Sequence, residues 1–139
     1  MTEMTSRLLD HYRSHVCQLM MPTSAPAHNP YLRLYLPMAL QKPSNLVKEW
    51  LLFGILSVAA FNQAQLSPEN RSLYRNKASE YKDKAAHLLK ACVAKAQEDV
   101  SAIVDSATDK QALLAAAITM TTIGVCPPRA SFSCRKCHN

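Results

Sequence analysis

The sequence Trp50-Leu-Leu-Phe-Gly-Ile-Leu-Ser-Val-Ala-Ala-Phe61 contains twelve residues without a charge. A helix over this stretch is apolar on nearly every side, which is typical of a helix enclosed by others, so we expect it to form the centre of the core. A membrane-spanning helix needs about 20 apolar residues, whereas a stretch of about twelve fits a buried helix. Because Lys48 and Glu49 border its start, we exclude a membrane span.

Two helical segments precede this stretch. The first covers residues 5–21, and we expect Thr5 or Ser6 to cap it. Its apolar residues recur at helical spacing: Leu8, Leu9, Tyr12, Val16, Leu19 and Met20. The second begins at Asn29-Pro30, because asparagine followed by proline is typical of a helix start. Its apolar face holds Leu32, Tyr35, Leu36, Ala39 and Leu40. Pro37 predicts a kink or break within it.

The central helix and the one after it have clear start signals. Ser44 is the expected cap of the central helix, which runs to about residue 66. Ser67-Pro68-Glu69 then starts an amphipathic helix over residues 68–99. The apolar stripe of this helix holds Tyr74, Ala78, Tyr81, Ala85, Leu88, Cys92 and Ala96. Lysines on its other face alternate with acids, and Glu80 and Lys84 have the favoured spacing for an ion pair.

A fifth helix is predicted over residues 109–123, capped by Thr108 or Asp109 and ended by Gly124. Its apolar residues are Leu113, Leu114, Ala117, Ile118 and Met120. The whole chain has two glycines, too few for the many turns of an all-β sandwich. We therefore predict an all-α fold of about five helices packed as antiparallel helical pairs over residues 1–123. Residues 124–139 are expected to form an irregular, disordered, basic tail that contains cysteines.

The charge of the chain is balanced outside the tail. Of 16 lysines and arginines, three lie in the last eleven residues: Arg129, Arg135 and Lys136. The remaining 13 positive charges face 10 negative charges, which is typical of an ordinary surface, so we expect no sequence-specific DNA binding from this chain. The N-terminus lacks the layout of a signal peptide and the five cysteines are odd in number, which favours a reducing compartment.

The tail contains one weak metal motif. Cys134 and Cys137 have the spacing of half a zinc site, and Cys126 and His138 are the other candidate ligands. A structural site usually has two cysteine pairs, and His138 directly follows Cys137, so we interpret these residues as part of an unstructured tail. We therefore predict no metal and no cofactor.

The other reactive side chains have structural interpretations. His11 and His15 are four residues apart, but the metalloprotease motif needs a glutamate after the first histidine and the chain has Tyr12. His87 is expected on the surface, and Cys92 fits the apolar stripe as a small buried residue. Cys17 also lies on a helix, and a nucleophile would need a base close in space. The stripe with Tyr74 and Tyr81 is expected to be core, so no catalytic residue is predicted and the chain is not expected to be an enzyme.

Seven pieces of the sequence occur in an order that resembles a known family. They are Leu8-Leu-Asp-His-Tyr12, Asn29-Pro-Tyr31, Leu36-Pro-Met-Ala-Leu40, Leu51-Leu-Phe-Gly-Ile-Leu-Ser-Val-Ala-Ala60, Ala78-Ser-Glu-Tyr-Lys82, Lys84-Ala-Ala-His-Leu-Leu89 and Ala112-Leu-Leu-Ala-Ala-Ala117. Over residues 5–123 this series resembles the start of the fungal-specific transcription factor domain. The resemblance implies an all-helical regulatory domain of a nuclear protein, without shared catalytic residues.

The resemblance also implies how such a segment works. In this family the DNA contact is made by a zinc binuclear cluster with six cysteines, whereas Cys17 is the only cysteine in the first ninety residues here. We therefore expect a truncated regulatory segment that acts in the nucleus by protein or effector binding, with protein partners or self-association. Two alternatives stay open: a stand-alone helical protein-interaction adaptor, or a small zinc-binding protein that uses the C-terminal cysteines.

Overall fold

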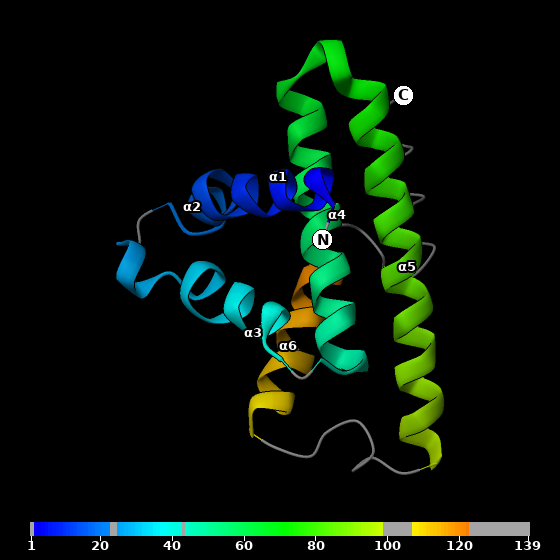
Figure 1. Cartoon of the computed structure of the whole chain (residues 1–139). Helices are drawn as coiled ribbons and strands as arrows, with labels where there is room; N and C mark the ends of the chain where they lie inside the picture. The colour runs from blue at the N-terminus through cyan, green and yellow to red at the C-terminus, as the bar shows by residue number, and fades with distance from the viewer. Residues whose placement is uncertain (1, 23–24, 43, 99–106, 123–139) are drawn as a thin grey trace.

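The computed structural model describes residues 2–22, 25–42, 44–98 and 107–122. Five continuous helices and no strand occur in this part of the chain (Figure 1). In chain order their elements are α1 (Glu3–His11), η1 (Tyr12–Val16) and α2 (Cys17–Met20); η3 (Tyr31–Tyr35) and α3 (Leu36–Leu40); α4 (Leu46–Leu66); η4 (Pro68–Asn70) and α5 (Arg71–Glu98); and α6 (Ala107–Thr122). A short 3-10 turn, η2 (Pro26–His28), lies between the first two helices. The predicted all-α class is thus confirmed, and the tail lies outside the described residues.

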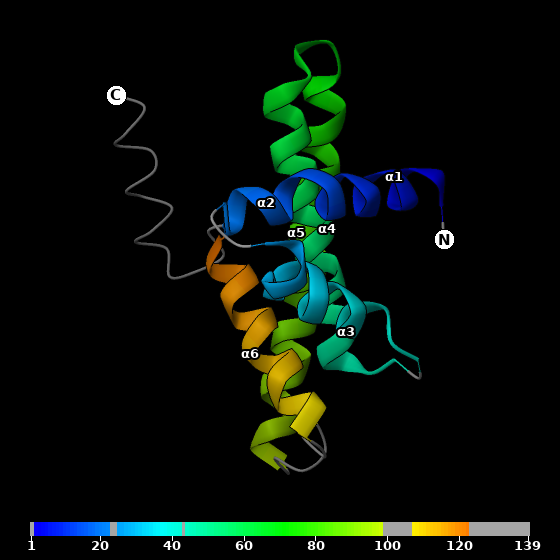
Figure 2. The same cartoon turned by 90° about the vertical axis from the view of Figure 1, so that its left-hand side faces the viewer.

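Helix α4 is the centre of the fold, as its sequence predicted. The antiparallel α5 packs along one side of it and α6 along another, while the first two helices, which run in opposite directions, lie across it (Figures 1 and 2). Leu51, Ile55 and Leu56 are at most 1 % exposed. The cap of α4 is Asn45, whose side chain accepts a hydrogen bond from the Lys48 N–H at 2.9 Å. The predicted cap, Ser44, precedes it by one residue.

The stripe of α5 packs against α4 as predicted. Tyr74, Ala78, Tyr81, Ala85 and Cys92 are buried, and Leu88 is partly buried against the same core. Ser57 reaches across from α4 and donates a hydrogen bond to the Ala78 carbonyl oxygen at 2.9 Å. This bond satisfies the hydroxyl group of Ser57, which is buried in the apolar centre of α4.

The first helix differs from its predicted pattern after Tyr12. Residues Tyr12–Val16 form a π-helical turn, in which the Cys17 N–H donates to the Tyr12 carbonyl oxygen five residues earlier. This turn holds one extra residue, which rotates all later residues by about 100°. As a result Cys17 is fully buried, whereas Leu19, predicted to be on the core face, is 55 % exposed. The cap is Thr2, whose side chain accepts from the Thr5 N–H at 3.1 Å, and not Thr5 or Ser6.

The second helix continues through Pro37, where we predicted a kink or a break, so a break is excluded. Its irregularity is a π-helical turn, Tyr31–Tyr35, that ends two residues before this proline. Proline has no N–H and its ring crowds the carbonyl group one turn earlier. A wider turn gives that carbonyl group room, so the helix continues to Leu40. Leu36 and Ala39 are buried as expected, and Met38 is buried as well.

Helix α6 buries mainly small side chains, and of the apolar residues named for it Met120 alone is buried. Its buried residues are small except for one methionine: Ala112, Ala115, Ala116, Thr119 and Met120. Leu114, one of the apolar residues named for this helix, is 61 % exposed. The reason lies on α4, where Gly54 lets the backbone of α6 come close, so that small side chains fill the contact. Thr108 and Asp109 lie inside the helix, which starts at Ala107, and are not its cap.

None of the described helices combines the length and the apolar character that a membrane crossing requires. Helix α4 has 21 residues, but it includes Lys48, Glu49 and several amides.

Candidate functional site

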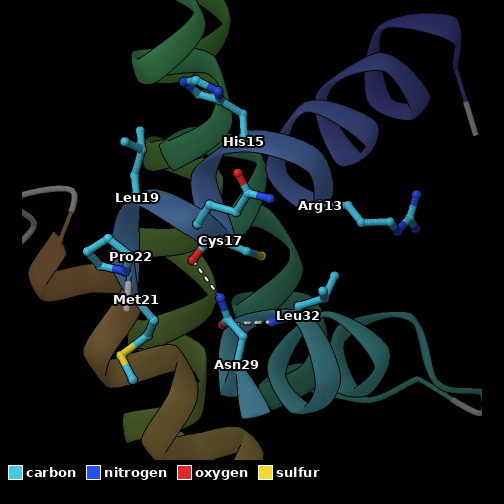
Figure 3. Close-up of a pocket in the computed structure, with 9 residues that line it drawn as sticks. Arg13, His15, Cys17, Leu19, Met21, Pro22, Asn29 and Leu32 are labelled. Atoms are coloured by element: carbon cyan, nitrogen blue, oxygen red, sulfur yellow. Dashed lines mark hydrogen bonds between the residues drawn. The ribbon is translucent and has the colours of Figure 1, made fainter. Parts of the chain in front are cut away.

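A cavity of about 400 Å³ lies where the first helix ends and the second begins (Figure 3). Nine residues line it: Arg13, His15, Cys17, Gln18, Leu19, Met21, Pro22, Asn29 and Leu32. Pockets that hold small molecules measure roughly 300–1,000 Å³. The cavity is therefore large enough for a small organic ligand.

Asn29 holds the two sides of this cavity together. Its Nδ2 donates a hydrogen bond to the Cys17 carbonyl oxygen at 2.7 Å, and its Oδ1 accepts from the N–H groups of Tyr31 at 2.9 Å and Leu32 at 3.4 Å. The side chain is 2 % exposed. Asn29 thus caps the second helix, as predicted, and also ties its start to the end of the first helix.

The lining combines apolar walls with hydrogen-bond donors. Leu19, Met21, Pro22 and Leu32 supply the apolar surface, and none of the described residues that line the cavity is acidic. Arg13 brings a positive charge, although its Nη1 also pairs with Asp10 at 2.9 Å on the exposed surface. Such a lining suits a ligand with an apolar body and an acceptor or anionic group.

The sequence analysis did not find this cavity. The Asn29-Pro30 start was identified as a helix cap, but the bond from Asn29 to Cys17 joins residues twelve positions apart. Leu19 lines the cavity only because the π-helical turn rotates it out of the core. The sequence gives no signal for this cavity, because the apolar residues of the first helix also fit the spacing of a regular α-helix.

Burial disfavours the thiolate form of the two buried cysteines of the described residues. Cys17 is fully buried, and burial raises the pKa of its thiol to about 11, against the opposing charge of Arg13. Burial also raises the pKa of Cys92. Both thiols are therefore protonated at neutral pH, and a protonated thiol is a poor nucleophile. The interpretation of Cys92 as a small core residue is confirmed.

His11 and His15 lie together at the edge of this region. Their rings stack with centroids 5.1 Å apart and planes inclined by 24°, and His11 Nε2 lies 2.7 Å from Asn62 Oδ1 on α4. A single metal ion would have to lie in the planes of both rings, which stacking does not favour. Within the described residues no group of three or more histidine, cysteine, aspartate or glutamate side chains could hold a metal ion.

The remaining candidates lie on α5 or in the tail. Tyr74 and Tyr81 are 4 % and 6 % exposed, so they are core residues as expected, and His87 is exposed. Lys84 pairs with Glu80 at 3.5 Å, as its spacing predicted. The candidate zinc ligands lie outside the described residues: Cys126, Cys134, Cys137 and His138.

Residues 7–137 match the family model of the fungal specific transcription factor domain, which is most of the chain. The chain belongs to this family. The match begins close to the expected start, but it continues past residue 123, where we expected the resemblance to end. No curated protein and no solved structure matches the chain.

The fungal specific transcription factor domain is a regulatory and not an enzymatic family, so membership indicates a role in the regulation of transcription. The buried cysteines and the stacked histidines described above are consistent with structural positions in such a domain.

Proposed function

We propose that this chain is a regulatory segment that controls transcription by binding a small effector in the cavity beside Asn29. The cavity is the observation that carries the proposal, because it has an apolar lining, a few donors and a size suited to a small molecule. The family match supports the regulatory role. The effector would act by changing how the first two helices pack on each other and on α4.

We further propose that the chain acts in the nucleus and does not read DNA sequence itself. The balanced charges on α5 support this proposal, since Glu80 lies 3.3 Å from Lys77 and 3.5 Å from Lys84. Lysines that are interleaved with acids in this way are typical of a solvated helix face, whereas a DNA-binding face has clustered positive charge.

Binding of 8-anilinonaphthalene-1-sulfonate tests the proposed pocket, because this fluorescent probe joins apolar rings to one anionic group. We expect saturable binding of one probe per chain to the purified protein. Leu32→Trp fills the cavity and is expected to reduce the affinity at least about tenfold, equal to about 1.4 kcal/mol. Leu114→Trp on the exposed face of α6 is the matched control and should leave the affinity unchanged.

The same titration can contradict the proposal that this cavity binds a ligand. Binding that does not saturate, or that Leu32→Trp leaves unchanged while the variant stays folded, would show that the cavity is not a ligand site. This result is expected if the chain is instead a stand-alone helical protein-interaction adaptor, which would bind only proteins. The zinc alternative predicts instead one Zn²⁺ bound per chain, lost on Cys134→Ser.

A further inference from the structure

The cavity beside Asn29 has a charged end and an apolar end. In Figure 3 Arg13 lies at one end, and three apolar residues lie at the other: Leu19, Met21 and Pro22. His15 and Gln18 add further hydrogen-bond donors to the lining, and none of the described lining residues is acidic. A ligand that fits both ends has an apolar body and an anionic group, because a cationic group at the charged end would meet a like charge.

Arg13 lines the cavity while it is held in an exposed ion pair. Its Nη1 lies 2.9 Å from Oδ1 of Asp10, three residues earlier in the same helix, and the two side chains are 48 % and 76 % exposed. Exposed ion pairs of this kind are weak, since both groups stay solvated. Arg13 can therefore exchange Asp10 for another carboxylate at little cost. Its planar guanidinium group suits a carboxylate, which it can bind through two parallel hydrogen bonds.

The charge of Arg13 already acts inside the cavity. Cys17, which also lines the cavity, is fully buried. Burial raises the pKa of its thiol, and the positive charge of Arg13 opposes this rise. The same charge would stabilise the anionic group of a ligand, and the apolar walls limit its screening by water.

We propose that the effector of this cavity is a monocarboxylic acid with an apolar chain, and that its carboxylate takes the place of Asp10 on Arg13. The apolar chain then lies against the end of the cavity that holds Leu19 and Met21. Asp10 is an internal competitor, which sets the concentration of acid at which the cavity fills. This inference rests on the proposed effector cavity and adds the chemical class of the effector.

Titration calorimetry of the full chain with octanoate and with octanol tests this class at neutral pH, where the acid is ionised. The two probes have apolar chains of similar length and differ in the charge of the head group. We expect octanoate to bind at least about tenfold more tightly than octanol, equal to about 1.4 kcal/mol. Octylamine carries the opposite charge and should bind no more tightly than octanol.

Two substitutions at the ion pair have opposite expected effects. Arg13→Gln removes the cation and should reduce the preference for octanoate over octanol to less than about threefold. Asp10→Asn removes the competitor and should strengthen octanoate binding about threefold, while octanol binding stays unchanged. Arg7→Gln and Glu3→Gln are the matched controls. They alter an exposed ion pair of the same helix, with atoms 2.8 Å apart and outside the cavity lining, and should change neither affinity.

The outcomes separate this inference from the proposed function. Equal binding of octanoate and octanol, or an Arg13→Gln variant that keeps the preference for octanoate, would overturn the carboxylate class and leave an apolar effector cavity in place. An Asp10→Asn variant that binds octanoate no more tightly than the parent would overturn the exchange of partners. If neither probe binds and 8-anilinonaphthalene-1-sulfonate does not saturate, the cavity is no ligand site and both proposals fail. Circular dichroism melts check folding, which we expect to be unchanged because Asp10 and Arg13 are exposed.

Discussion

Gly54 has no side chain, and this absence allows α6 to lie directly against α4. A Cβ atom at this position would lie 2.9 Å from Thr119 Cγ2, closer than packed carbon atoms approach. The Thr119 side chain is 4 % exposed, and its hydroxyl donates to the Ala115 carbonyl oxygen at 2.8 Å. The Thr119 methyl group could turn away only by breaking this hydrogen bond, so a Cβ atom at position 54 would strain the contact between the two helices.

Gly54→Ala is therefore expected to lower the free energy of unfolding by about 1 kcal/mol, measured by urea denaturation. Overpacking typically costs about 1–3 kcal/mol. This cost exceeds the gain of about 1 kcal/mol from the higher helix propensity of alanine relative to glycine. Thr119→Ser removes the methyl group, so in that background Gly54→Ala should be neutral or stabilising. A Gly54→Ala protein that is more stable than the parent would mean that α6 does not approach α4 this closely.

Protonation of His11 should destabilise the fold. Burial lowers the pKa of His11 below its ordinary 6.5, the neighbouring His15 lowers it further, and the hydrogen bond to Asn62 opposes both. Below about pH 6.5 the unfolded chain binds a proton that the folded chain does not, so this contribution is present above that pH and lost as the pH falls through it. In melts between about pH 8 and pH 5, His11→Gln should show a smaller loss of stability on acidification than the parent. An identical pH profile would rule out this role for His11.

Among the elements, the π-helical turn Tyr12–Val16 decides which side of the first helix meets the core. It places Cys17 inside and Leu19 outside. In a regular α-helix one residue shorter, Tyr12, Cys17 and Met20 would again share one face, because they would be separated by four and three positions. One residue of this turn can therefore be deleted without changing which residues face the core.

Deletion of Ser14, an exposed residue of this turn, tests that register. We expect a regular α-helix with the same buried residues and a change in unfolding free energy of less than about 1 kcal/mol, the size of typical exposed substitutions. Deletion of the exposed Asn76 is the control, because it rotates one half of α5 by about 100° relative to the other and should abolish the cooperative melt. If both deletions unfold the chain, the π-helical turn has a structural role of its own.

The first helix and α6 show which features of the fold the sequence pattern does not predict. The five helices followed from apolar spacing and from prolines, since these signals are local, whereas the predicted caps of the first helix, of α4 and of α6 lay at the wrong residues. The exposure of Leu19 could not be predicted in this way, because no local sequence pattern indicates a π-helical turn. The alanine face of α6 also escaped prediction, because its burial depends on Gly54, which is distant in sequence. The cavity was missed for a related reason, since Asn29 builds it by a bond to the preceding helix.

At the scale of the whole molecule, all described helices contribute to one apolar core around α4. Leu56 is 1 % exposed at its centre. Leu56→Asp places an unpaired charge there, which costs more than a marginally stable domain of about 5–15 kcal/mol can tolerate. We expect loss of helical circular dichroism and of the cooperative melt. Leu66→Asp, on the same helix but 54 % exposed, should remain folded; a folded Leu56→Asp would contradict this core.

The central place of α4 has a consequence for how the chain folds during synthesis. Helix α4 makes its most extensive contact with α5, the element that follows it, and less with the helices made before it. When residues 46–66 leave the ribosome, an apolar helix is exposed until residues 71–98 are also free. At that stage α4 can pack only on the first two helices, with which its contact is less extensive than with α5. We expect chaperones to bind this nascent segment, and the amides of α4 to exchange most slowly with deuterium once the native state has formed.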